Sequence, residues 1–181
     1  MGEAAEKMMD PSGRSAASPA GSLVERLRSV HLKMVDAVLG GDGLQQVAAL
    51  AAEAAGAPVA IVVPRLDAAV ASSGASGEPG VRDAVLEDVR RYVTDRVRDR
   101  PSPVPEALTA EAPIQSGDDV VGAVVLLRGE EEPAVEAGDF LHLAAVACLT
   151  EVAVEEAYRV RTGEAGEEIL QAHPDAATTP A

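Results

Sequence analysis

The residues best suited to ligand binding lie on a predicted helix that runs from Val81 to about Arg98. Arg82, Arg90 and Tyr92 stand there next to segment 72–80, which is rich in Gly and Ser. A guanidinium group binds carboxylates and phosphates, and a tyrosine hydroxyl adds a further hydrogen bond. We therefore take these three side chains as candidate ligand-binding residues. The alternative is that this is an ordinary solvated helix face of mixed charge, because acidic residues lie among the arginines. These acidic residues are Asp83, Glu87, Asp88, Asp95 and Asp99.

The single cysteine and the three histidines offer no evident chemistry. Cys148 lies among Ala, Val and Leu residues with no basic residue near it, which favours a packed thiol over a reactive one. His31, His142 and His173 are too few and too scattered for a metal site that is evident from sequence. One cysteine also excludes an intrachain disulfide and a cysteine-based zinc site.

Sequence motifs of catalysis are also missing. The chain has no phosphate-binding loop, no Gly-x-Ser-x-Gly elbow and no paired-carboxylate signature. We therefore expect no catalysis, no metal and no cofactor. A small enzyme or cofactor carrier is kept only as a third alternative.

The composition indicates an acidic, soluble domain. The formal net charge of −15 argues against nucleic acid or an anionic membrane as the main partner, because both would repel the protein. No continuous apolar run approaches the roughly 20 residues that span a bilayer, and no signal-peptide core is present. A single cysteine fits a reducing compartment, so we expect a cytoplasmic protein. With 47% hydrophobic but only 2% aromatic residues, its core must consist of Ala, Val and Leu.

Hydrophobic periodicity and turn residues predict the element order α-α-β-β-α-β-β-α. This order indicates an α+β fold, with an antiparallel sheet flanked by helices and long N- and C-terminal helices on one side. The predicted helices are 22–40, 42–56, 81–98 and 138–161, and the predicted strands are 59–63, 68–72, 108–114 and 120–127.

These elements divide the chain into three parts. Residues 1–21 form a disordered arm, 22–161 the domain, and 162–181 a flexible tail. Ser22 is predicted to cap the first helix, because Glu25 follows at capping-box spacing. Asp42 is predicted to cap the second helix.

The second strand of the 108–127 hairpin is almost wholly apolar. A strand of this kind is typical of a central position, buried on both faces. We therefore predict that Val121, Val124 and Leu126 lie in a central strand. Gly122 is predicted to allow a close backbone approach or a bulge there.

The same hairpin resembles a GAF domain, a small sensor module of signalling proteins. Ala112-Pro113-Ile114, the Gly117 turn and Val120–Leu126 match the family's strand end, turn and apolar strand, and Asp139–Ala157 looks like its final helix. The resemblance covers about residues 22–161. It is nearest to the sensors of actinobacterial helix-turn-helix regulators of the sugar-diacid and purine-catabolism type. No helix-turn-helix pattern follows here, so direct DNA binding is not expected.

The first and last helices carry more apolar surface than one contact uses. A helix that is apolar nearly all round must bury both faces, so we predict a homodimer that joins these helices in a four-helix bundle. The predicted interface residues are Val24, Val35, Leu39, Leu141, Ala145, Cys148 and Val152.

The resemblance implies a regulatory domain that senses a small molecule or binds a partner protein. The main alternative is a ligandless dimerisation module whose site is filled by its own Val and Leu side chains. A void of some hundreds of Å³ between the sheet and Val81–Val97 would favour sensing, and a packed face there would favour the ligandless module.

Overall fold

The fold of the chain is given by a computed structural model, which describes residues 19–74 and 80–172. Its helices and strands follow the predicted order, and the α+β class is confirmed. The elements are α1 (Pro19–Gly40), α2 (Gly43–Ala55), β1 (Val59–Val63), the short 3₁₀ helix η1 (Pro64–Leu66), β2 (Ala68–Ser72), α3 (Asp83–Val97), β3 (Leu108–Ser116), β4 (Asp119–Leu127) and α4 (Ala137–Ala172).

The strands form one open antiparallel sheet in the order β2-β1-β4-β3. β4 lies between β1 and β3, and its residues from Val121 to Leu127 are all buried. β1 is likewise buried along its whole length. The predicted central position of β4 is therefore confirmed. Its physical cause is the run of Val and Leu, which stabilises the fold only if both faces are covered.

Gly122 makes the close approach that the sequence predicted. A Cβ atom built on Gly122 would lie 2.4 Å from the carbonyl oxygen of Val62 on β1. On the other side of β4, the register with β3 shifts between Ile114 and Gln115, which leaves Val121 as the extra residue of a bulge. Only a residue without a side chain fits at this point between two strands.

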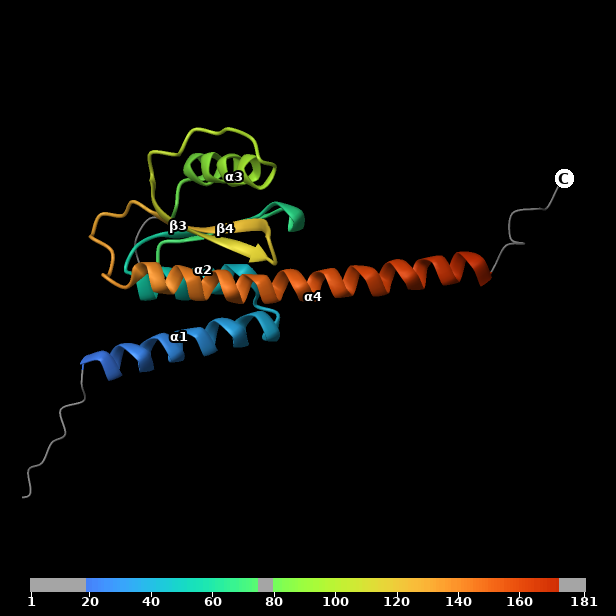
Figure 1. The fold of residues 1–181 in the computed structure, drawn as a ribbon, viewed down its shortest axis with the longest axis horizontal. Coiled ribbons are helices and arrows are strands. Elements are labelled where there is room, and N and C mark those ends of the chain that lie inside the picture. Colours follow the sequence, from blue (N-terminus) through green and yellow to red (C-terminus); the bar gives the residue numbers. More distant parts are fainter. Residues whose placement is uncertain (1–18, 75–79, 173–181) are drawn as a thin grey trace, which may run out of the picture.

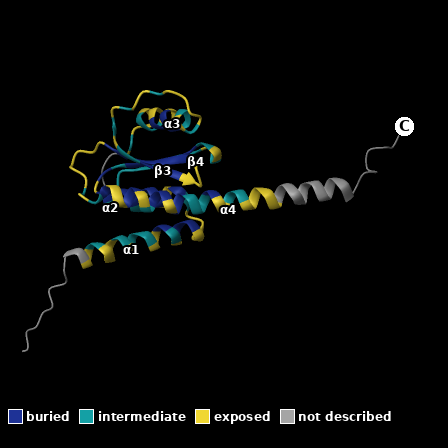
Figure 2. Ribbon diagram, viewed as in Figure 1, coloured by how far each residue is buried: buried dark blue, intermediate teal, exposed yellow. Residues whose placement is uncertain are grey.

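The helices form layers on the two faces of the sheet (Figure 1). α3 covers one face, while α2 and α4 cover the other and α1 packs outside them. The larger hydrophobic cluster lies between the sheet and the α2–α4 layer, and includes Ile61, Val124 and Leu141. The smaller cluster lies under α3 (Figure 2). α4 extends well beyond the sheet at its C-terminal end (Figure 1).

Three predicted helix ends differ in the structure. α1 begins at Pro19 rather than Ser22, since proline has no amide hydrogen to lose at the first helical position. Asp42 precedes α2 as predicted, but its backbone is already helical and its side chain makes no capping hydrogen bond. α4 continues to Ala172 rather than ending near Arg161, because Glu, Ala, Leu and Gln favour helix beyond that point. The remainder of the predicted arm and tail, 1–18 and 173–181, lies outside the described residues.

By length and composition, one described segment is apolar enough to cross a membrane, Ala137–Arg161 of α4. The core helix of a soluble protein meets the same criteria, so this is weak evidence. Continuous apolar runs did not reveal the segment because Asp139 and Glu151 interrupt it. Leu141 and Cys148 of this segment are buried inside the domain, as in a soluble fold.

Candidate functional site

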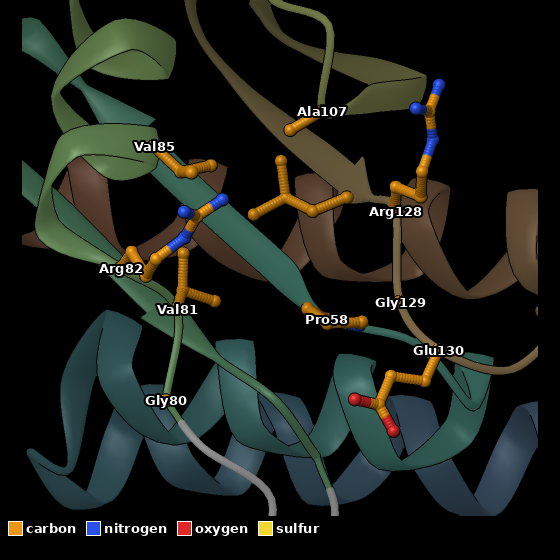
Figure 3. A pocket seen from close by; sticks show the side chains of 10 residues that line it. Pro58, Gly80, Val81, Arg82, Val85, Ala107, Arg128, Gly129 and Glu130 are labelled. Carbon is orange, nitrogen blue, oxygen red and sulfur yellow. The ribbon is translucent and has the colours of Figure 1, made fainter.

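A hollow of about 430 Å³ lies at the N-terminal end of α3, where β1 begins and β4 ends (Figure 3). The antiparallel pairing of β1 with β4 brings Pro58 and Leu127 together at this edge, and the amide of Leu127 donates a 2.8 Å hydrogen bond to the Pro58 carbonyl. The chain entering α3 closes the other side. The lining residues are Pro58, Gly80, Val81, Arg82, Val85, Ala107, Leu127, Arg128, Gly129 and Glu130.

The hollow combines apolar side chains with two exposed arginines. Arg82 and Arg128 lie on opposite sides of it (Figure 3). Neither guanidinium forms an ion pair or hydrogen bond with any residue that the structure describes. Two arginines without ion-pair partners beside an apolar lining can bind a small molecule that carries an anionic group on an apolar part. Glu130 is the acidic residue of the lining.

A second hollow of about 420 Å³ adjoins the first and shares Arg82, Val85, Ala107 and Arg128 with it. Its further lining residues include the carboxylates Asp88 and Glu106. The two arginines are therefore accessible from both hollows. The acidic side chains confine the positive region to the vicinity of the arginines.

Arg90, the second predicted ligand-binding residue, lies elsewhere. Its Nη2 donates to Asp67 Oδ1 at 2.6 Å, and its Nη1 lies 4.0 Å from Glu87 Oε2. It lines a different hollow, between α3 and the β1–β2 turn, where acidic residues neutralise it. Arg90 is thus a partner in exposed ion pairs rather than a free cation.

Tyr92, the third predicted residue, is buried on the face of α3 that contacts the sheet. Its hydroxyl donates to Glu111 Oε2 at 3.1 Å and accepts from Arg96 Nη1 at 3.1 Å. Arg96 also pairs with Glu111 and lies over the tyrosine ring. Tyr92 therefore anchors α3 to β3.

The three predicted residues do not converge. Arg90 and Tyr92 are two residues apart on α3, which places them about 200° apart around a helix. The structure keeps Arg82 at the site and adds Arg128, which the sequence analysis missed. The one sequence feature that could have indicated Arg128 is its position, as a single basic residue directly after an apolar strand and before Gly129.

The sheet face under the rest of α3 is packed. Val89, Tyr92 and Val93 of α3 contact Val62 and Val125 of the sheet, and these residues are all buried. Toward the C-terminal end of α3, the space against the sheet amounts to about 10 Å³. Space for a ligand is thus limited to the surface hollows around α3, and no large void separates the helix from the sheet within the described residues.

The predicted dimer-interface residues divide between surface and core. Val24 and Leu39 of α1 are 65% and 67% exposed, and Val35 is half-buried. The predicted residues of α4 are buried inside one chain and cannot contact a second copy, so that part of the prediction is wrong. Periodicity revealed two apolar faces of α4 but not which one the sheet covers. The buried residues are Leu141, Ala145, Cys148 and Val152.

Cys148 illustrates the consequence of this burial. Burial raises the pKa of the thiol to about 12, and the negative charge of Glu151 adds to the rise. The folded state therefore favours the protonated, unreactive thiol. Its contribution to stability is present below the pKa of the unfolded thiol and is lost as the pH rises toward 12.

We expect Cys148 to resist thiol reagents in the native protein. At pH 8, labelling with a disulfide reagent should be at least about 100-fold slower than in urea-unfolded protein, because reaction requires an exposed thiolate. Absorbance of the released chromophore measures both rates. Rapid labelling of protein that retains its native circular dichroism would contradict the packed position.

The remaining polar residues form no evident metal centre. In the described part of the chain, no group of three His, Cys, Asp or Glu side chains could hold a metal ion. His31 Nδ1 is buried on α1 and has no described hydrogen-bond partner. A single nitrogen of this kind does not make a metal site.

No protein-family model, curated protein or solved structure matches this chain. Inferences about function therefore depend on the chemistry of the described surfaces. The hollow beside Arg82 and Arg128 has the two features of a small-molecule site, an apolar lining and a few polar groups.

Proposed function

We propose that this chain is a GAF-like regulatory domain of the cytoplasm, without catalytic activity, that binds a small anionic molecule at the N-terminal end of α3. The observation that carries the proposal is the hollow of about 430 Å³ flanked by Arg82 and Arg128. The element order and the hairpin of the sequence, which resemble a GAF domain, support a regulatory protein rather than an enzyme. Such domains act by coupling ligand occupancy to an output elsewhere.

The dimensions of the hollow limit the ligand. Sites for small molecules usually enclose about 300–1,000 Å³, so this one lies at the small end of that range. Val81, Val85 and Leu127 supply apolar contact, and the two guanidinium groups supply charge-assisted hydrogen bonds. A small carboxylate or phosphate ester with a short apolar part fits both requirements.

The proposal is tested by replacing the two arginines. We expect wild-type protein to melt at a higher temperature with some members of a panel of small dicarboxylates, aromatic carboxylates and nucleoside monophosphates. A ligand at about 100 times its Kd adds about 2.7 kcal/mol to the free energy of unfolding. Arg82→Gln and Arg128→Gln should each weaken binding about tenfold or more, because a charge-assisted hydrogen bond contributes about 1.5–3 kcal/mol.

Arg100→Gln is the matched control, since Arg100 is exposed and lies outside the hollow. It removes the same charge and should leave binding unchanged. Hydrogen exchange at segments 80–86 and 127–130 should slow when a ligand binds. If a compound raises the melting temperature equally in all three variants and leaves exchange there unaltered, it binds elsewhere and the hollow is not the site.

The packed face between α3 and the sheet favours a second candidate, a ligandless interaction module. In that case, no panel member changes the melting temperature of the wild type. Native mass spectrometry of protein purified from its own host distinguishes the two candidates further. A retained small molecule supports sensing, and a bare chain mass supports the ligandless module.

A further inference from the structure

The solvent-facing side of α4 carries an uncharged stripe, which we call the α4 seam. Its residues recur at alternating steps of three and four, the spacing of a coiled-coil contact. Val146 and Val160 are 55% and 60% exposed, Ala153 and Ala157 are also exposed, and the other two members are half-buried. The α4 seam consists of Leu143, Val146, Thr150, Ala153, Ala157 and Val160.

We propose that a second copy of this chain docks antiparallel on the α4 seam. The proposal goes beyond ligand sensing and does not depend on it. The opposite side of α4, with Leu141 and Cys148, is already buried in the domain. The α4 seam is therefore a second apolar face of α4. Its own chain covers part of Leu143, which packs against the core, and leaves Val146, Ala153, Ala157 and Val160 exposed.

The order of residue sizes along the α4 seam favours the antiparallel arrangement. In an antiparallel pair centred on Thr150, Leu143 faces Ala157 of the second copy, and Val146 lies within one residue, about 1.5 Å along the axis, of the level of its Ala153. Each large side chain then meets a small one, which gives interdigitated packing. A parallel pair would set Ala153 against Ala153 and Ala157 against Ala157, which leaves voids.

The charges at the two ends of the α4 seam support the same orientation. Asp139 lies at its start and Arg161 at its end, and both are exposed. An antiparallel pair brings Asp139 of one copy near Arg161 of the other, whereas a parallel pair brings like charges together. With a net charge of −15, two copies repel each other over most of their surface. An uncharged contact with complementary ends reduces this repulsion.

The extent of the α4 seam sets the expected affinity. At 1.5 Å per residue the seam runs about 26 Å along the helix, and a helix is about 10 Å wide. The footprint of about 260 Å² per copy is below the roughly 800 Å² of a stable complex. We therefore expect a weak dimer, with a Kd of about 1–100 µM.

The test is sedimentation velocity of the full chain up to about 500 µM, well above the expected Kd. The wild type should pass from monomer to dimer. Val146→Glu and Ala153→Lys should each remain monomeric while melting like the wild type, because both positions are exposed. Ala84→Glu on α3 is a control at another exposed position, and should still form the dimer.

Mixing the two variants tests the antiparallel orientation. A chain with Val146→Glu and a chain with Ala153→Lys place opposite charges together only when residue 146 of one copy faces residue 153 of the other. We expect the mixture to dimerise although neither variant does so alone. A mixture that stays monomeric overturns the antiparallel geometry, as a wild type that is monomeric at all concentrations overturns the dimer. A dimer that survives Val146→Glu but dissociates in Leu32→Glu would place the contact on α1 instead.

Discussion

Val124→Asp is expected to leave the chain unfolded. Val124 is completely buried in β4, where it pairs with Ile61 of β1 and Ala112 of β3. An aspartate there would be surrounded by mostly aliphatic side chains, and no charged side chain is buried in the described part of the chain to pair with it. Burying the carboxyl without a partner costs about 5 kcal/mol or more, including the lost packing of the valine. Because domains of this size are stable by about 5–15 kcal/mol, this cost removes most or all of the stability.

Circular dichroism with thermal melting measures this result. The variant should show no cooperative transition, whereas the wild type should show one. Val120→Asp is the matched control, since Val120 stands on the same strand but is 36% exposed. It should fold and lose no more than about 1 kcal/mol. A Val124→Asp protein of near-normal stability would exclude the central position of β4.

Gly122→Ala is expected to reduce the free energy of unfolding by about 3 kcal/mol, the upper part of the range for an overpacked interior. The added methyl group would lie 2.4 Å from the Val62 carbonyl oxygen and 3.3 Å from Val63 Cα. Both are backbone atoms of a buried strand, so they cannot rotate away as a side chain would. β4 must therefore move away from β1, which weakens the central pairing of the sheet.

Urea unfolding measures the change in midpoint and slope. The midpoint of Gly122→Ala should fall while the slope is retained, since the fold stays the same. Gly138→Ala is the control, because a Cβ at Gly138 meets nothing within 4 Å in the first turn of α4. Gly138→Ala should be neutral or should stabilise the protein by up to about 1 kcal/mol, which is the difference in helix propensity between glycine and alanine. Equal midpoints for the two variants would contradict the close contact at Gly122.

The sequence alone determined the helices and strands and their order. The apolar run of β4 can be stable only in the middle of a sheet, so Val124 was assigned to the core correctly. Gly122 interrupts this apolar run and contributes no side-chain contacts to the core. A glycine at such a position therefore predicted that another strand's backbone approaches closely. Cys148 was likewise expected to be packed from its aliphatic neighbours. In each of these cases, neighbouring residues in the sequence are enough to indicate that the position is buried.

The candidate site and the free face of α4 were decided only by the tertiary structure. Arg128 lies across the hollow from Arg82 because β4 pairs with β1 and ends next to α3, and no local sequence pattern predicts that these two residues line the same hollow. Leu141 and Val146 are both apolar residues of one helix, yet the first is buried and the second is exposed. Periodicity gives the angle between residues on a helix, but the rotation of that helix against the sheet follows from the packing of all the elements together.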